Sequence, residues 1–175
     1  MTHDWRNYIL AAVFGFGVLA TALFMPSSRA LAFGASSAED EANIQFKKAE
    51  KAINVKDYGN AVQLLQGVLK SDPNNADALN YLAFSQRNLG QVDDAMKNYN
   101  AALAIKPDHK GALEYQGELY LMIGNPTAAE ANLDKLNRIC KFGCKEKDIL
   151  QAALEHFSDK KSSSLEPPHT SMTRY

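Results

Sequence analysis

Hydrophobic residues recur every three or four positions through most of this chain, which is the spacing of an amphipathic helix. The clearest stretch runs from Asn75 to Pro107. Gly90 breaks the pattern and Pro107 stops it, so we expect two helices. Ala83 and Ala95 stand where small side chains let the two helices approach closely. The stretch predicts a helical hairpin.

The same spacing recurs once before this stretch and once after it, at one fixed interval. Counting Ala76 as position 1, position 8 is small and position 20 is alanine in every copy: Ala49, Ala83 and Gly117, then Ala61, Ala95 and Ala129. The fit is uneven, since Lys56 occupies position 15 of the first copy and Lys141 replaces the final proline of the third. One hairpin cannot bury its apolar face alone, so three copies predict a stack of hairpins.

This pattern resembles the tetratricopeptide repeat (TPR), a helical hairpin with a period of about 34 residues. The resemblance covers about residues 42–136. It implies an all-α fold, an α-solenoid of three hairpins at about 42–75, 76–109 and 110–141 within residues 42–141. A helical bundle without repeats is the competing interpretation.

Polar residues at the start of each stretch predict where the helices begin. Ser37 and the acids after it open the first helix, which we expect to end near Asn54, and Asn75 caps the third helix. Asp108 is the expected cap of the fifth helix. Asn125 and a following proline restart the chain after Gly124.

The first 32 residues have a different composition from the rest. A short polar start with Arg6 precedes an apolar run over residues 8–25, and an Ala-Leu-Ala sequence ends at Ala32. These are the three parts of a secretory signal peptide, so residues 1–32 are expected to be cleaved before Phe33 and the protein to be exported to the periplasm. The competing interpretation is an anchor in the inner membrane, because residues 8–25 are just long enough to span it. Residues 33–41 are expected to form a short linker and the start of the first helix.

A further apolar face follows the third copy. Residues 142–157 carry it, and we expect them to form a helix that caps the last hairpin, because a terminal repeat otherwise exposes its hydrophobic surface. Residues 158–175 are polar, contain proline and have no period, which predicts a disordered tail.

The chain has two cysteines, Cys140 and Cys144, where the repeat pattern fails. In an exported protein, thiols this close are expected to form a disulfide bond, and Gly143 gives the loop the freedom to do so. A thiol-redox carrier is an alternative, but the motif Cys-x-x-Cys is missing. A metal site is another, but no histidine has ligand spacing to the pair.

Charge and motifs exclude several classes of function. Without residues 1–32, nineteen Lys and Arg lose Arg6 and Arg29, and twenty Asp and Glu lose Asp4, so the net charge is near −2. The lysines are scattered, so we expect no nucleic-acid partner. No phosphate loop, zinc-protease motif or nucleophile elbow is present, and neighbouring acids are best explained as residues of helix starts. We expect no catalytic residues, no metal, no cofactor and no enzyme activity.

The TPR resemblance implies which residues line a concave groove. The first helix of each pair faces it, and the expected groove residues are Asn43, Phe46, Glu50, Asp77, Asn80, Tyr81, Phe84, Arg87, Asn88, Glu114, Tyr115 and Glu118. The central set is the strongest candidate, because Tyr81, Phe84 and Arg87 lie three apart on one helix face and are residue types of interface hot spots. The alternative is that Tyr81 and Phe84 belong to the core.

One subtype of the family does not fit. TPR proteins that bind a chaperone's carboxyl terminus use Lys, Asn and Arg at positions that here hold Phe46, Glu50, Tyr81, Gly111 and Tyr115. A mixed aromatic, amide and acidic groove indicates a helix or extended segment with apolar and basic side chains.

The sequence thus predicts an exported TPR scaffold or adaptor that binds a protein or peptide partner. Two alternatives remain: a structural part of an envelope assembly that binds through its ends or convex face, possible as an oligomer, and a thiol-redox carrier that uses Cys140 and Cys144. Membrane contact is expected only through an uncleaved amino-terminal segment.

Overall fold

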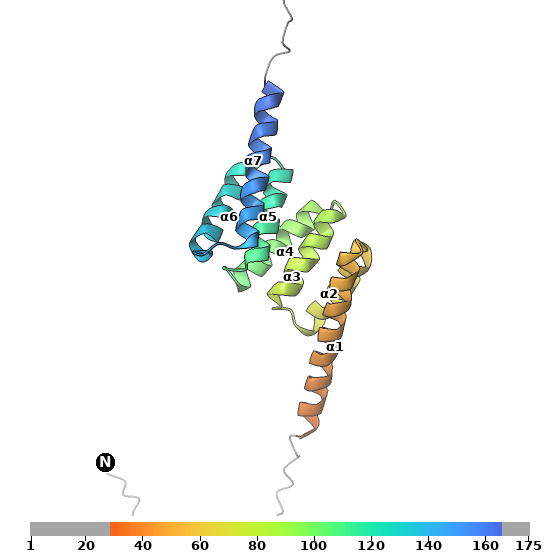
Figure 1. Cartoon of the computed structure of the whole chain (residues 1–175). Coiled ribbons are helices and arrows are strands. Elements are labelled where there is room, and N and C mark those ends of the chain that lie inside the picture. Colours follow the sequence, from red (N-terminus) through yellow and green to blue (C-terminus); the bar gives the residue numbers. More distant parts are fainter. Residues whose placement is uncertain (1–28, 166–175) are drawn as a thin grey trace, which may run out of the picture.

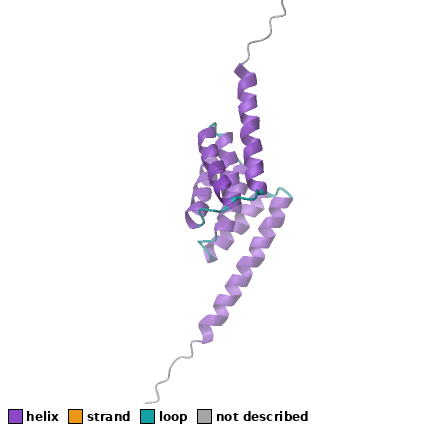
Figure 2. Ribbon diagram, turned by 60° about the vertical axis from the view of Figure 1, so that its left-hand side comes forward, coloured by secondary structure: helices purple, strands orange, loops and turns teal. Residues whose placement is uncertain are grey.

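The computed structural model describes residues 29–165, and in this part of the chain it contains seven helices and no strand (Figures 1 and 2). The helices are α1 (Arg29–Asn54), α2 (Tyr58–Ser71), α3 (Ala76–Asn88), α4 (Val92–Ile105), α5 (Lys110–Met122), α6 (Pro126–Ile139) and α7 (Lys145–Leu165). None of these helices is both long and apolar enough to cross a membrane.

Neighbouring helices pair in the order of the sequence. α1 packs on α2, α3 on α4 and α5 on α6, while α2 contacts α3 and α4 contacts α5. α7 packs on both α5 and α6, so it covers the last hairpin, and α1 and α7 project from opposite ends of the stack (Figure 1). The expected α-solenoid of three hairpins with a capping helix is confirmed.

The repeated small residues lie where two helices come closest. Ala49, Ala83, Ala61, Ala95 and Ala129 are fully buried in the core. Gly117, the third residue at position 8, faces Leu150 of α7: a Cβ atom on Gly117 would lie 2.6 Å from both methyl groups of Leu150. The absence of a side chain at Gly117 therefore lets α7 dock on α5.

Position 15 of each copy has the left-handed backbone conformation that ends the first helix of the hairpin. Gly90 and Gly124 both have φ of 76°, and Lys56 has φ of 62°. Glycine adopts this conformation at little cost, whereas a residue with a Cβ is strained by about 1–2 kcal/mol.

Replacing Lys56 with glycine is therefore expected to raise the free energy of unfolding by about 1 kcal/mol, because the relief of strain exceeds the entropy that glycine loses on folding. Urea denaturation measures the change. Lys106 is an exposed residue with φ of −131°, so Lys106→Gly is the matched control and should bring no gain. Equal effects of the two substitutions would contradict the assignment of strain to Lys56.

The helix ends correct two expectations. The short linker expected within residues 33–41 is part of α1, since the four alanines from Ala30 to Ala38 favour helix over the single Gly34. The capping helix begins at Lys145 and continues to Leu165, so residues 158–165 of the expected tail are helical. A helix that is already packed on α5 and α6 extends at little cost until proline stops it, and Pro167 is the first proline after α7 begins. The signal peptide or anchor at residues 1–28 and the tail beyond residue 165 lie outside the described residues.

Candidate partner-binding groove

Five aromatic side chains from three hairpins, four on α1, α3 and α5 and one at the start of α2, form two contacting groups, which together we call the aromatic row. Phe46 of α1 lies against Tyr81 of α3, with ring centroids 5.6 Å apart. Phe84 of α3 contacts Tyr115 of α5 at 4.8 Å and Tyr58 at 6.0 Å. All five rings are half-buried, so each both packs on the protein and presents a surface to solvent.

Tyr58 is the one member of this row that the sequence did not indicate. It is the first residue of α2, where the hairpin turns, and its ring meets Phe84 edge-on. The family positions used to predict groove residues all lie on the first helix of each hairpin. They could not indicate Tyr58, which is the first residue of a second helix.

Arg87 joins the last two hairpins at the floor of the groove. Its Nη1 donates to Glu118 Oε2 at 2.6 Å and to the backbone oxygen of Tyr115 at 3.1 Å. Its guanidinium also lies 5.3 Å from the ring centroid of Phe84. The side chain of Arg87 is only 14% exposed. Its main role is therefore to position Glu118 and the rings of Phe84 and Tyr115, and not to reach into solvent.

Tyr81 and Phe84 belong to neither the core nor the free surface. The inner positions of α3 are held by buried Leu79, Leu82 and Gln86. Tyr81 packs at the margin of the first core cluster. The aromatic partners of the Phe84 ring are Tyr58 and Tyr115. Each therefore offers one face to a ligand.

Two of the expected groove residues are buried more deeply than a surface contact needs. Asn80 is 4% exposed and Glu114 is 5% exposed. They line a cavity of about 260 Å³ where α3, α5 and α7 meet, with Tyr81, Tyr115, Lys145 and Glu146 among its other lining residues. Glu146 of α7 is half-buried at this cavity. The capping helix thus closes one end of the groove.

Asp77 fixes a histidine at the edge of the same cavity. His109, and not Asp108, is the N-cap of α5: its Nδ1 accepts from the backbone N–H of Ala112 at 3.1 Å. Its Nε2 lies 2.9 Å from Asp77 Oδ1. Since Nδ1 accepts, the proton of neutral His109 is on Nε2 and is donated to Asp77. The histidine both caps α5 and ties it to α3.

Burial shifts the acid–base behaviour of this part of the groove. Desolvation, with the nearby charges of Glu118 and Glu146, raises the pKa of Glu114 to about 7. Burial also raises the pKa of Tyr115 to about 12 and that of Tyr81 above its usual value. The phenols are therefore neutral at physiological pH, and Glu114 changes charge near neutrality.

The remaining expected residues lie along the margins. Asn43 is exposed beside Phe46 and lines an outer cavity of about 580 Å³, and Glu50 lines another of about 520 Å³ with Tyr81. Asn88 is exposed, and its Nδ2 donates to the backbone oxygen of Phe84 at 2.8 Å. The structure thus brings the central residues together and leaves Asn43 and Asn88 exposed beside them.

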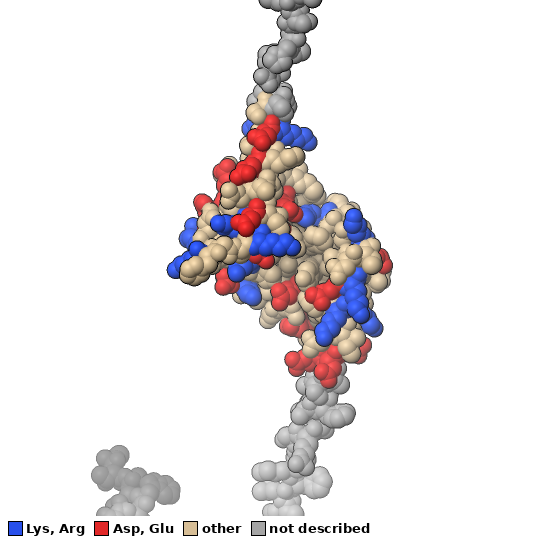
Figure 3. All heavy atoms as spheres, viewed as in Figure 1, with Lys and Arg blue, Asp and Glu red and all other residues tan. Residues whose placement is uncertain are grey.

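Charged side chains of both signs are interspersed over the face of the molecule seen in Figure 3. The described residues contain no group of three or more His, Cys, Asp and Glu side chains that could hold a metal ion. The groove offers aromatic surface and hydrogen-bond acceptors, which suit the recognition of another chain.

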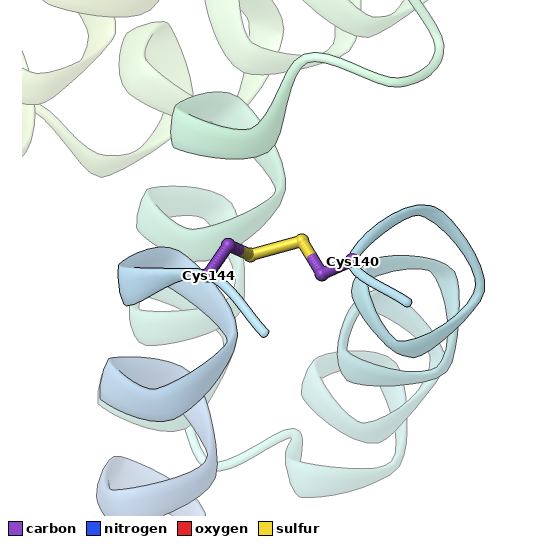
Figure 4. Close-up of a disulfide and its surroundings, with 2 residues drawn as sticks. All are labelled: Cys140 and Cys144. Carbon is purple, nitrogen blue, oxygen red and sulfur yellow. A yellow bond between two sulfur atoms is a disulfide. The ribbon is translucent and has the colours of Figure 1, made fainter. Parts of the chain in front are cut away.

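Cys140 and Cys144 lie in the connection between α6 and α7, away from the aromatic row. Figure 4 shows their sulfur atoms bonded across the turn, and their Cα atoms are 5.6 Å apart, the spacing of a disulfide bond. The turn contains Gly143 with φ of 88°. That the pair is oxidised in the cell stays a prediction.

Comparison with known proteins bears on the fold and the family. Two profiles of the tetratricopeptide repeat match residues 52–109 and 85–140, which together are more than half of the chain. Over 74 residues the chain is 35% identical to tetratricopeptide repeat protein 37 of Xenopus laevis, a match that covers 42% of this chain and 5% of that protein.

Solved structures share the fold at low identity. The Yersinia enterocolitica type III secretion translocator chaperone SycD has a TM-score of 0.62 and 18% identity, over 70% of this chain and 95% of that chain. PcrH in complex with the chaperone-binding region of PopD (TM-score 0.61, 16% identity) covers 70% and 95%. The first TPR of Spaghetti, bound to an HSP90 peptide (TM-score 0.61, 16% identity), covers 70% and 94%. With the repeat profiles and the three hairpins in agreement, this chain belongs to the tetratricopeptide repeat family.

Proposed function

We propose that this protein is an exported adaptor that binds a protein or peptide partner in its groove and does no catalysis itself. The observation that carries the proposal is the row of five half-buried aromatic rings across three hairpins. Rings that are already packed lose little side-chain entropy on binding, so they present a preorganised apolar surface. Two proteins of similar fold were solved with a peptide or partner segment bound.

The residues that line the groove indicate the chemistry of the partner. The rings of Phe46, Phe84 and Tyr115 favour apolar side chains spaced along a helix or an extended segment. Glu50, Glu118 and the buried Glu114 add acceptors, which favour basic residues in the same segment. Export rests on the composition of residues 1–32, with its apolar run and Ala-Leu-Ala end.

Site-specific photo-crosslinking in cells tests the proposal. A benzoylphenylalanine probe that replaces Phe84 keeps an aromatic ring in the groove, and the matched control probe replaces the exposed Lys135 of α6. The exported fraction is expected to contain a discrete adduct from the probe at residue 84 and none from the probe at residue 135. Equal adducts from both positions, or adducts confined to unexported protein, would contradict the proposal.

A structural role in an envelope assembly is a second candidate, which one observation favours. α6 and α7 border a cavity of about 620 Å³ at the end of the stack, lined by apolar Leu133, Leu154 and Phe157. In a longer solenoid the next helix would pack there. A third probe at the exposed Gln151, which lines this cavity, separates the two candidates: an adduct from residue 151 alone would favour the structural role.

A further inference from the structure

The groove ends at α7 in a cavity that offers two acceptors, Asn80 Oδ1 and the carboxylate of Glu114. Asn80 lines the cavity, is 4% exposed, and its Oδ1 has no hydrogen-bond partner among the described residues. A buried amide oxygen without a donor is unfavourable and rare in folded proteins. A ligand that brings a donor to Asn80 would satisfy it.

Glu114 supplies a second acceptor to the cavity. The residue is 5% exposed, and no hydrogen bond or ion pair joins its carboxylate to another described residue, but unlike Asn80 Oδ1 its oxygens still reach solvent through the cavity. The nearest guanidinium, that of Arg87, is already bonded to Glu118. A carboxylate that is partly desolvated at the wall of a small cavity favours a ligand that carries positive charge.

The walls of the cavity suit a cationic group with an apolar stem. Tyr81 and Tyr115 line it from α3 and α5, and aromatic rings attract cations through their faces. Ile149 of α7 also lines it and offers a surface for methylene groups. The volume of about 260 Å³ admits one such side chain.

We propose that this cavity binds one cationic side chain of the partner, the guanidinium of an arginine or the ammonium of a lysine, through Glu114 and Asn80. The inference rests on the proposed function, because a segment lying along the aromatic row would bring such a side chain to the α7 end of the groove. Charge and unpaired acceptors therefore define the specificity of this end.

Lys145 is the cation of this chain that could compete for the same acceptors. It lines the cavity at the start of α7, but it is an exposed residue and makes no ion pair with Glu114. Its ammonium therefore remains hydrated at the rim. Replacing Lys145 with glutamine removes a repulsive charge and is expected to tighten the binding of a cationic probe about twofold.

Titration of the full-length protein with blocked amino acids tests the proposal. The probes are Nα-acetyl-arginine methylamide and Nα-acetyl-lysine methylamide, with the citrulline derivative as the uncharged analogue of arginine. Nuclear magnetic resonance follows the side-chain amide of Asn80 and the backbone amide of Gly111, which also lines the cavity. Ligands of this size that bury one charged group bind with dissociation constants on the order of 1 mM.

The charged probes are expected to shift both signals saturably, and the citrulline derivative is expected to shift neither. The charged probe with the lower dissociation constant identifies the preferred group. At pH 8, where Glu114 is ionised, Glu114→Gln is isosteric and removes the negative charge, and it should weaken the charged probes at least tenfold. Glu155→Gln on the exposed face of α7 is the matched control and should change nothing. Equal binding of citrulline and arginine, or no saturable shift at millimolar concentrations, would overturn the inference.

The adaptor function and the cation site can be refuted independently of each other. A crosslinked partner at Phe84 without binding of the charged probes would leave the adaptor function and remove the cation site. Binding of the probes without an adduct at Phe84 would leave the site and remove the adaptor function.

Discussion

Replacing Leu150 with alanine is expected to lower the free energy of unfolding by about 2–5 kcal/mol. Leu150 is fully buried and joins α7 to the last core cluster, which includes Leu113, Leu121 and Leu136. Its loss leaves a cavity beneath α7, where the last hairpin has no further repeat to cover it. Because the total stability of small domains is about 5–15 kcal/mol, this is a large fraction. Urea denaturation measures it, and a change below about 1 kcal/mol would contradict the docking of α7 on α5.

A double-mutant cycle with Gly117 makes the test specific to that contact. In the wild-type background, Gly117→Ala forces a methyl group against Leu150 and is expected to destabilise by about 1–2 kcal/mol, since overpacking exceeds the gain in helix propensity. In the Leu150→Ala background the same methyl group enters the new cavity and is expected to stabilise. Additive effects of the two substitutions would show that Gly117 and Leu150 are not in contact. Exposed His156→Ala is the control on α7 and should lie within about 0.5 kcal/mol of wild type.

The wild-type protein is expected to lose about 3 kcal/mol of stability as the pH rises from about 4.5 to above 7, and the Glu114→Gln variant is expected not to show this loss. The folded-state pKa of Glu114 is raised from 4.5 to about 7, so the folded protein holds a proton that the unfolded chain has released. The stabilisation is fully present below pH 4.5 and is lost as the pH rises through 7. Urea denaturation at pH 5 and pH 8 measures it: the wild type should lose stability relative to the glutamine variant.

The comparison isolates Glu114 from its charged surroundings. Titratable and charged groups face it from each packed element: Glu118 on α5, Arg87 and Asp77 on α3, His109 at the start of α5, and Lys145 and Glu146 on α7. These groups are present in both proteins, so their own titration contributes nearly equally to both curves. Parallel curves for the wild type and the Glu114→Gln variant would mean that the carboxyl group is hydrated and its pKa ordinary.

Local patterns were enough to predict the elements and the way they pair. Small residues at positions 8 and 20 predicted the closest helix contacts, and Ala49, Ala83 and Ala95 are fully buried. Gly90 and Gly124 predicted where the first helix of a hairpin ends, and the backbone there is left-handed. These features depend on spacing along one helix or across one hairpin, and each repeat presents them again. The ends of α1 and α7 were less predictable, because helix extension depends on small differences in propensity and on packing.

The candidate groove was predicted as a set of positions but not as a set of contacts. Family positions indicated Tyr81, Phe84 and Tyr115, and the structure places their rings side by side with those of their neighbours. They did not indicate that Arg87 is held by Glu118, because that ion pair joins residues 31 apart. Tyr58 was missed because it is the first residue of α2, outside the family positions on the first helix of each hairpin.

By itself the sequence determined the all-α class, the three hairpins and the need for a cap, because each follows from apolar periodicity and from the helix signals at glycine, proline and asparagine. Only the tertiary structure decided that His109 caps α5 while it binds Asp77, that Gly117 admits Leu150, and that α7 closes the groove over Glu114. Burial and electrostatic environment depend on which helices meet in space. The chemistry of the groove's end arises from α3, α5 and α7 together, and no single stretch of the chain contains it.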